Sequence, residues 1–148
     1  MLNIKPFKQS KGYCGPASLK MVLGHYKIHK SENELAKLTK TSRTKGCKEE
    51  NMVKLAKKFG LNAYFKENSS IKELKSLIKK KIPVIVDWFS SEENGHYSLV
   101  IGFNKNKIII ADPHFGKIKK HNIKWFEERW FDIVNKKRIN KEIIVIKQ

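Results

Sequence analysis

The sequence contains few cysteines, prolines and arginines, and such scarcities exclude whole classes of protein. Two cysteines in 148 residues are too few for a disulfide-stabilised scaffold. Neither a CxxC nor an HExxH motif is present, so the spacing predicts no zinc site, and we expect neither a metal ion nor a cofactor. Internal repeats and low-complexity tracts are also absent, which leaves a globular protein.

Long apolar runs are missing as well. The longest runs, such as residues 108–111, have the length of a strand and are far too short to cross a bilayer. The N-terminal residues carry charge but no apolar segment typical of a secretory signal, so we expect a cytoplasmic protein. A chain of 148 residues, 40% of them hydrophobic, is long enough for one domain with a sizeable core but short for two. We therefore expect a single domain over residues 1–148.

Basic residues are abundant, and the formal net charge is +18. Only three of the 32 basic residues are arginines (Arg43, Arg129 and Arg138), although arginine is favoured for base and phosphate recognition. The lysines are spread along the whole chain rather than gathered in one segment. We therefore expect a solvated basic surface with a bias toward acidic partners, and no nucleic-acid partner.

The hydrophobic pattern changes character at Pro83. Before it, apolar residues recur mainly at helical spacing, with capping-box patterns that begin at Ser31 and Ser70. After it, short apolar runs are typical of strands. Segregated helices and strands predict an α+β fold with an antiparallel sheet. The expected helices cover 14–27, a segment from 31, 48–59 and 70–80; the expected strands cover 62–65, 84–89, 96–103, 107–112 and 142–147, and 117–131 is expected to hold a short strand followed by an aromatic-rich turn or helix.

The stretch QSKGYCGPASLKMVL places Cys14 directly before Gly-Pro, at the start of the first expected helix. Pro16 suits the first turn of a helix, where its missing N–H is no loss. Unpaired N–H groups and the positive end of the helix dipole both favour a negatively charged sulfur, which is the nucleophilic form. Cys-Gly-Pro alone is equally compatible with a small buried residue that begins a helix.

A cysteine nucleophile needs a base, and the base needs a group that orients it. Among the five histidines, His96 follows a polar loop and begins an apolar strand, as expected for a residue at the edge of a cleft. Asp112 ends the next strand, directly before Pro113, although Asp-Pro is also a common turn opener. Cys14, His96 and Asp112 are therefore the candidate catalytic residues.

The pairing of the two strands decides whether His96 and Asp112 can meet. A three-residue loop over residues 104–106, closed by a left-handed Asn106, would place Ser98 opposite Asp112. His96 would then be a diagonal neighbour of Asp112 on the same face, about 7–8 Å away between backbones. A four-residue loop without a bulge would turn Asp112 to the opposite face. If these residues are catalytic, Ser98 must therefore pair with Asp112.

Gln9 lies five residues before Cys14, in the segment that must approach the start of the helix. Its side-chain amide and the backbone N–H of Cys14 could point at one developing negative oxygen, as in an oxyanion hole. Taken alone, Gln9 is better interpreted as a plain surface residue.

Two blocks, QSKGYCGPASLKMVLGHY and GHYSLVIGFNKNKIIIADPHFG, together resemble the papain-like cysteine peptidases of the C39 and C39-like group. The resemblance covers about a quarter of the chain. It implies a papain-like fold, in which a helical lobe packs against an antiparallel sheet. It also implies a peptide or protein substrate, with Cys14 as nucleophile, His96 as base, Asp112 as orienting group and Gln9 in the oxyanion hole.

The implied reaction is acyl transfer through a thioester, which water resolves in a peptidase. An amine acceptor would instead give a transpeptidase of the phytochelatin-synthase type, and the residues do not decide between the two. A third alternative is a catalytically idle papain-like domain that binds peptides or leader sequences.

Overall fold

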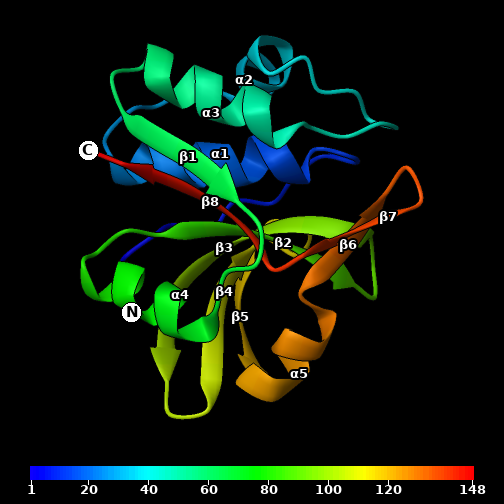
Figure 1. The fold of residues 1–148 in the computed structure, drawn as a ribbon. Helices are drawn as coiled ribbons and strands as arrows, with labels where there is room; N and C mark the ends of the chain where they lie inside the picture. The colour runs from blue at the N-terminus through cyan, green and yellow to red at the C-terminus, as the bar shows by residue number, and fades with distance from the viewer.

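Three helices form one lobe of the computed structural model, which describes all residues 1–148. They are α1 (Cys14–His25), α2 (Glu32–Leu38) and α3 (Glu49–Lys58). Figure 1 shows them gathered on one side of the sheet. The predicted cap of α2 is confirmed, because the side chain of Ser31 accepts a hydrogen bond from the backbone N–H of Glu34 at 3.1 Å.

A six-stranded sheet forms the other half of the molecule. Its strands run in the order β1-β8-β2-β3-β4-β5, and every neighbouring pair is antiparallel. This arrangement confirms the predicted α+β fold with an antiparallel sheet. The strands are β1 (Asn62–Lys66), β2 (Val84–Ser90), β3 (Asn94–Asn104), β4 (Lys107–Asp112), β5 (Lys117–Asn122) and β8 (Glu142–Lys147).

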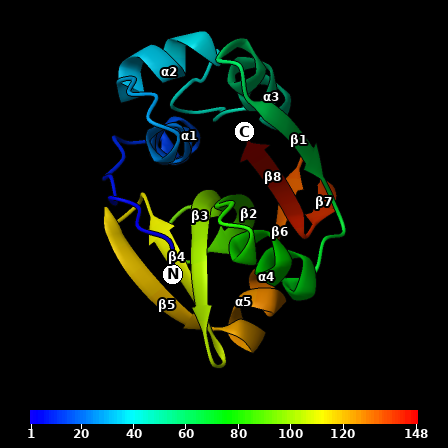
Figure 2. The same cartoon turned by 90° about the vertical axis from the view of Figure 1, so that its left-hand side faces the viewer.

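Both faces of the sheet are covered, because its central strands are apolar on both sides. The first core packs side chains such as Leu99 and Ile144 against α1 and α3. The second packs Val100 and Val145 against the opposite layer, formed by α4 (Ile71–Lys79) and α5 (Ile123–Arg129). Figure 2 shows this layer on the side of the sheet away from α1. Two buried faces explain why these strands read as continuous apolar runs.

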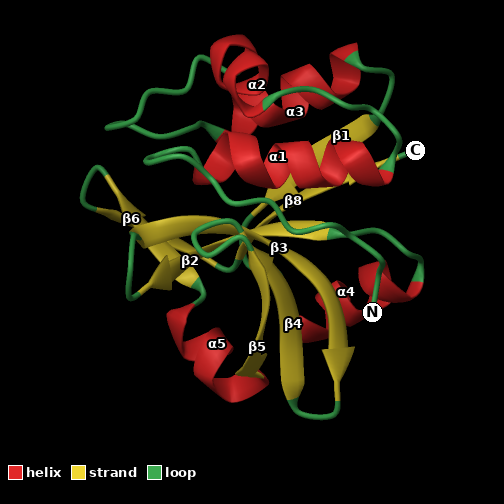
Figure 3. Ribbon diagram, turned by 180° about the vertical axis from the view of Figure 1, so that it is seen from behind, coloured by secondary structure: helices red, strands yellow, loops and turns green.

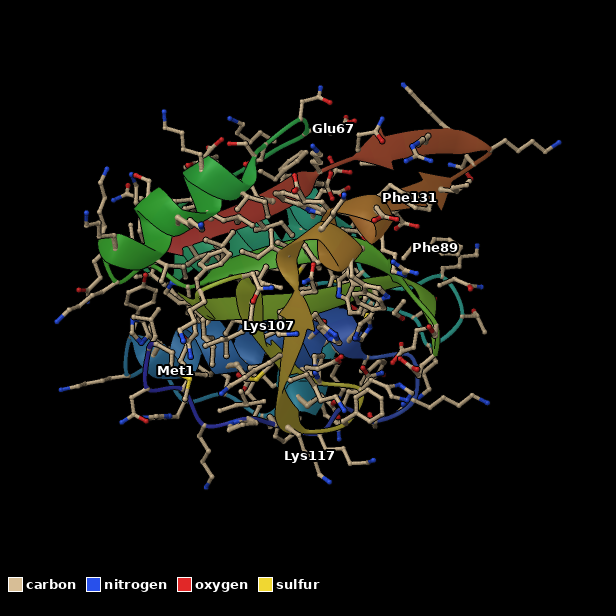
Figure 4. The ribbon with its side chains drawn as sticks, turned by 90° about the horizontal axis from the view of Figure 1, so that it is seen from below. Met1, Glu67, Phe89, Lys107, Lys117 and Phe131 are labelled. Carbon is tan, nitrogen blue, oxygen red and sulfur yellow. The ribbon has the colours of Figure 1, made fainter.

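A short hairpin that the sequence did not predict extends from the sheet. It consists of β6 (Phe131–Val134) and β7 (Lys137–Asn140). Its strands are short and mostly exposed, so they lack the apolar alternation that marks a strand. Phe131 stacks on Phe89 of β2, with ring centroids 5.1 Å apart, and thereby fastens the hairpin to the sheet (Figure 4).

The β3–β4 connection differs from the predicted loop, and the pairing next to it is one residue away from the predicted register. Asn104 pairs with Lys107, so the loop has two residues, and Lys105 rather than Asn106 takes the positive φ. A bulge between Val100 and Gly102 then shifts the pairing by one residue. Beyond the bulge Leu99 pairs with Ala111, which places the end of β4 beside the start of β3 as required.

None of the helices combines the length and the apolar character that a bilayer-spanning segment requires.

Candidate active site

Cys14 is the first residue of α1 and its side chain is half-buried. Gly15 follows it at a point where the chain has no room for a side chain. A Cβ atom there would lie 2.6 Å from Cβ of Cys47 and 3.5 Å from the ring of Tyr97. Glycine therefore lets the first turn of α1 sit close against both the segment before α3 and strand β3. Pro16 is buried in this turn, as its position in the sequence predicts.

His96 and Asp112 form the contact that the sequence analysis predicts. Nε2 of His96 donates to Oδ1 of Asp112 at 2.7 Å, and the two side chains are only 1% and 2% exposed. The same carboxylate oxygen accepts the backbone N–H of His114 at 3.0 Å, which fixes its position from a second side. This bond holds the imidazole in one orientation and leaves Nδ1 as the nitrogen free for chemistry.

Cys14 lies beside this imidazole. Its sulfur, a ring nitrogen of His96 and a carboxylate oxygen of Glu93 are all within 4.8 Å of one another. Nδ1 of His96 is buried and has no hydrogen-bond partner. Burial alone would lower the pKa of His96, but its contacts with Asp112 and Cys14 outweigh burial and raise that pKa well above the usual value. The site therefore favours a positively charged imidazole beside the sulfur.

Gln9 reaches the site through its backbone and its side chain. Its backbone N–H donates to the carbonyl of Pro113 at 2.8 Å, which ties the segment before α1 to the end of β4. Its side-chain amide donates to the backbone carbonyl of Ser10 at 3.2 Å and contacts Oε1 of Glu93 at 3.4 Å. Gln9 thus lies next to the carboxylate that adjoins the sulfur.

Glu93 is a site residue that sequence reasoning missed. It belongs to the polar loop before β3, and its Oε1 is 3.6 Å from Nδ1 of His96. Its Oε2 accepts a hydrogen bond from Nδ1 of His114 at 2.7 Å. Burial would raise the pKa of Glu93, but its contacts with the two histidines dominate and lower it to about 2. The carboxylate is therefore charged at neutral pH and stabilises a protonated His96.

Cys14, Glu93 and His96 also offer the thiolate, carboxylate and imidazole ligands that zinc accepts. Zinc bond lengths of about 2.0–2.3 Å bring ligand atoms to about 3.5 Å from one another. Separations of up to 4.8 Å would have to shrink before the three could hold an ion. Glu93 and His96 are only three residues apart, but no local motif could have added Cys14 to them, because it lies in a distant segment.

A second group of ionisable side chains lies on the face of the sheet that packs against α1. Asp87 of β2 pairs directly with Tyr97 of β3 on one side and with Glu142 of β8 on the other. Asp132 of β6 lies against Gly95 of β3, and Glu49 of α3 accepts a hydrogen bond from the hydroxyl of Tyr97. We call Glu49, Asp87, Asp132 and Glu142 the acidic cluster.

Burial and the crowding of like charges keep protons on the two buried members of the acidic cluster, Asp87 and Glu142. Burial, followed by the hydrogen bond and charge of Asp132, raises the pKa of Asp87 well above its usual value. Burial, followed by the neighbouring Glu49, raises the pKa of Glu142 to about 9. The unfolded chain would release these protons at much lower pH, so the folded protein binds more protons than the unfolded chain at neutral pH.

Stability is therefore expected to fall as the pH rises from about 5 to 9, the window between the ordinary and the raised pKa values of these carboxyl groups. We expect a loss of the order of 2 kcal/mol, which corresponds to about 4–8 °C in the melting temperature. Glu142→Gln should flatten this dependence and unfold at a higher temperature than the wild type at pH 8.5. Thermal unfolding across this range tests the expectation, and a melting temperature that is constant or rises would contradict it.

A family profile and several curated proteins match the sequence of this chain. Residues 1–137 match the sequence profile of the Peptidase_C39 like family. An uncharacterised protein of Methanothermobacter marburgensis is 31% identical over 113 residues, which make up 76% of this chain and 73% of that protein. The chain spans only 16–18% of the length of the processing and transport proteins among its curated relatives.

Two solved structures share the fold. The peptidase domain of Streptococcus ComA, a bi-functional ABC transporter involved in a quorum sensing pathway, matches with a TM-score of 0.80 and 25% identity over 98% of both chains. A double glycine motif protease from an AMS/PCAT transporter, in complex with the leader peptide, matches with a TM-score of 0.77 and 24% identity over 98% of this chain and 91% of that one. Because the family profile covers nearly the whole sequence, this chain belongs to the Peptidase_C39 like family and is a cysteine peptidase.

Proposed function

We propose that residues 1–148 act as one catalytic domain in which Cys14, His96 and Asp112 form the catalytic triad. The observation that carries the proposal is the chain of contacts from sulfur to imidazole to carboxylate. The sulfur of Cys14 lies within 4.8 Å of a ring nitrogen of His96, and Nε2 of His96 donates to Asp112 at 2.7 Å. The nucleophile, base and orienting group thus stand in the order that acyl transfer requires.

In the first step, the sulfur of Cys14 attacks the carbonyl carbon of the scissile peptide bond. The C–N bond then breaks, the leaving amine takes the proton held by His96, and a thioester remains on the sulfur. In the second step, His96 takes a proton from water, and the resulting hydroxide equivalent attacks the thioester. The C–S bond then breaks, which releases the product with a free carboxylate and returns Cys14 as a thiolate beside the protonated His96. The carboxylate of Asp112 stabilises the charged imidazole in both steps.

Gln9 is proposed as the donor to the oxyanion, together with the backbone N–H of Cys14. Its side-chain amide is held by Ser10 and by Oε1 of Glu93 beside the sulfur. A substrate carbonyl oxygen would compete with Glu93 for this amide. The side chain of Glu93 must therefore release the amide of Gln9 when substrate binds.

The proposed substrate is a peptide or protein segment that lies extended across the site. A double-glycine leader sequence is the first candidate, because a structurally similar protease was solved with a leader peptide. Two small residues would pass most easily between Cys14 and the adjoining loop. A cytoplasmic location belongs to this proposal, since the sulfur must stay reduced to react.

A peptide-library cleavage assay tests the proposed function. The library should contain Gly-Gly sequences in varied contexts, and the products of the wild type and of Cys14→Ala should be compared by mass spectrometry. Products with a free carboxylate at the new terminus indicate hydrolysis, whereas new amide bonds indicate transpeptidation. Cleavage by the wild type alone supports the proposal, and equal cleavage by both proteins refutes it.

A further inference from the structure

The acidic cluster is unpaired although the protein has a large excess of basic residues. The five ion pairs of the structure use Glu73, Glu93, Asp112 and Glu127 as their acids, and none involves a member of the cluster. With 32 basic and 14 acidic residues, a purely structural cluster could readily have acquired a cationic partner. Lys141 precedes Glu142 in sequence but lies 3.8 Å from Glu127 instead.

The interior of the cluster contains an unsatisfied polar atom. Glu142 is only 4% exposed, and its Oε1 has no hydrogen-bond partner. The strand pairing also sets Glu142 directly opposite Asp87, so the two carboxyl groups would repel each other if both ionised without a nearby cation. Native proteins satisfy nearly all their buried polar atoms, so an exception of this kind points to a ligand or a functional role.

The cluster adjoins the proposed nucleophile. Gly95 directly precedes His96, and a methyl group at Gly95 would collide with the carboxylate of Asp132. Gly15, which follows Cys14, packs close to the ring of Tyr97, and Tyr97 pairs directly with Asp87. In Figures 1 and 3, the start of α1, the loop before α3 and the β6–β7 hairpin all lie at the same end of the molecule.

We propose that the acidic cluster binds a cationic group of the substrate peptide close to the bond that Cys14 attacks. This inference rests on the proposed peptidase function and adds a substrate class to it. Asp132 and Glu49 are half-buried and form the entrance, whereas Asp87 and Glu142 are buried and form the floor. An ammonium or guanidinium group would supply the missing hydrogen-bond donors and counter-charge together.

The cation meets two kinds of acceptor at this site. Glu49 already accepts a hydrogen bond from the hydroxyl of Tyr97 at 3.3 Å, which orients its carboxylate. The free Oε1 of Glu142 offers an acceptor with no competing protein donor. When the cation enters, Asp87 and Glu142 release protons, because a nearby positive charge favours ionised carboxyl groups. The basic outer surface still favours acidic segments elsewhere on the substrate, so the cationic preference is local.

Matched peptides test the inference. Internally quenched Gly-Gly peptides should carry lysine, norleucine or glutamate in turn at each position from four before to two after the scissile bond. We expect one position at which lysine exceeds norleucine by about tenfold or more in kcat/KM. Free and acetylated N-termini distinguish a side-chain cation from an α-ammonium group. Binding of the same peptides to Cys14→Ala, followed by fluorescence anisotropy, gives a readout that needs no catalysis.

Charge-matched variants assign the effect to the cluster. Asp132→Asn should remove most of the lysine preference, whereas Glu34→Gln, which makes the same charge change on the exposed side of α2, should leave it intact. The inference is overturned if lysine and norleucine peptides bind and react equally, if no peptide binds, or if Asp132→Asn keeps the preference. Selective binding of lysine peptides without any cleavage by the wild type would refute the peptidase function but support the cationic site.

Discussion

Replacing Cys14 with alanine is expected to lower kcat/KM for peptide cleavage at least about a thousandfold. The reaction needs a sulfur atom that attacks the substrate carbonyl, and the sulfur of Cys14 lies within 4.8 Å of a ring nitrogen of His96. Binding and the oxyanion donors remain in the variant, so a small residual rate over water is expected. The measurement is a continuous assay with an internally quenched peptide that the wild type cleaves.

Cys47→Ser is the matched control for this variant. Cys47 lies against Gly15, one residue from the nucleophile, yet it makes no contact with the imidazole of His96 that the mechanism uses. We expect this variant to keep most of the wild-type activity. If Cys47→Ser lost activity to the same extent as Cys14→Ala, or if Cys14→Ala stayed active, Cys14 would not be the nucleophile.

Asp112→Ala should give the second large loss, about 10³–10⁴-fold in kcat. The substitution removes the acceptor for Nε2 of His96 and leaves a buried donor without a partner. It also removes the acceptor for the backbone N–H of His114. We expect a stability loss of about 1–3 kcal/mol in addition, because unpaired buried donors are unfavourable by that amount.

Asp112→Asn distinguishes orientation from charge. The amide oxygen can still accept both hydrogen bonds, so the ring of His96 keeps its orientation and only the negative charge is lost. We expect a loss of the order of tenfold, together with an upper limit of the pH–rate profile at lower pH, because the carboxylate helps to raise the pKa of His96. Full activity of Asp112→Ala in this series would exclude Asp112 from the mechanism.

Most of the fold and the central contact of the site could be predicted from sequence. Local patterns such as the caps at Ser31 and Ser70 act over a few residues, and the structure shows both. The pairing of β3 and β4 beyond the bulge was predicted correctly, although the loop and the pairing next to it were not. The shorter loop shifted the pairing by one residue, and the bulge between Val100 and Gly102 shifted it back by one. The final pairing keeps the apolar side chains on the buried faces of the sheet. The alternation of buried side chains therefore predicted the pairing beyond the bulge better than the residues of the turn did.

The rest of the site depends on contacts between distant segments. Glu93 and His114 stand in two polar turns, where the sequence pattern is typical of exposed residues. They meet only because β3 and β4 are neighbours and bring the two turns together. The acidic cluster likewise forms when β8 inserts between β1 and β2, which sets Glu142 beside Asp87. No local periodicity encodes the strand order of a sheet, so these contacts could not be predicted.

The most direct test of the central claim is the rate at which iodoacetamide alkylates each cysteine at neutral pH, measured by mass spectrometry of the intact protein and its fragments. A positively charged His96 beside the sulfur should make Cys14 react at least about a hundredfold faster than Cys47, whose pKa is raised by burial. His96→Ala should abolish that advantage. Similar rates at both cysteines, or a fast Cys14 that does not respond to His96→Ala, would contradict the account.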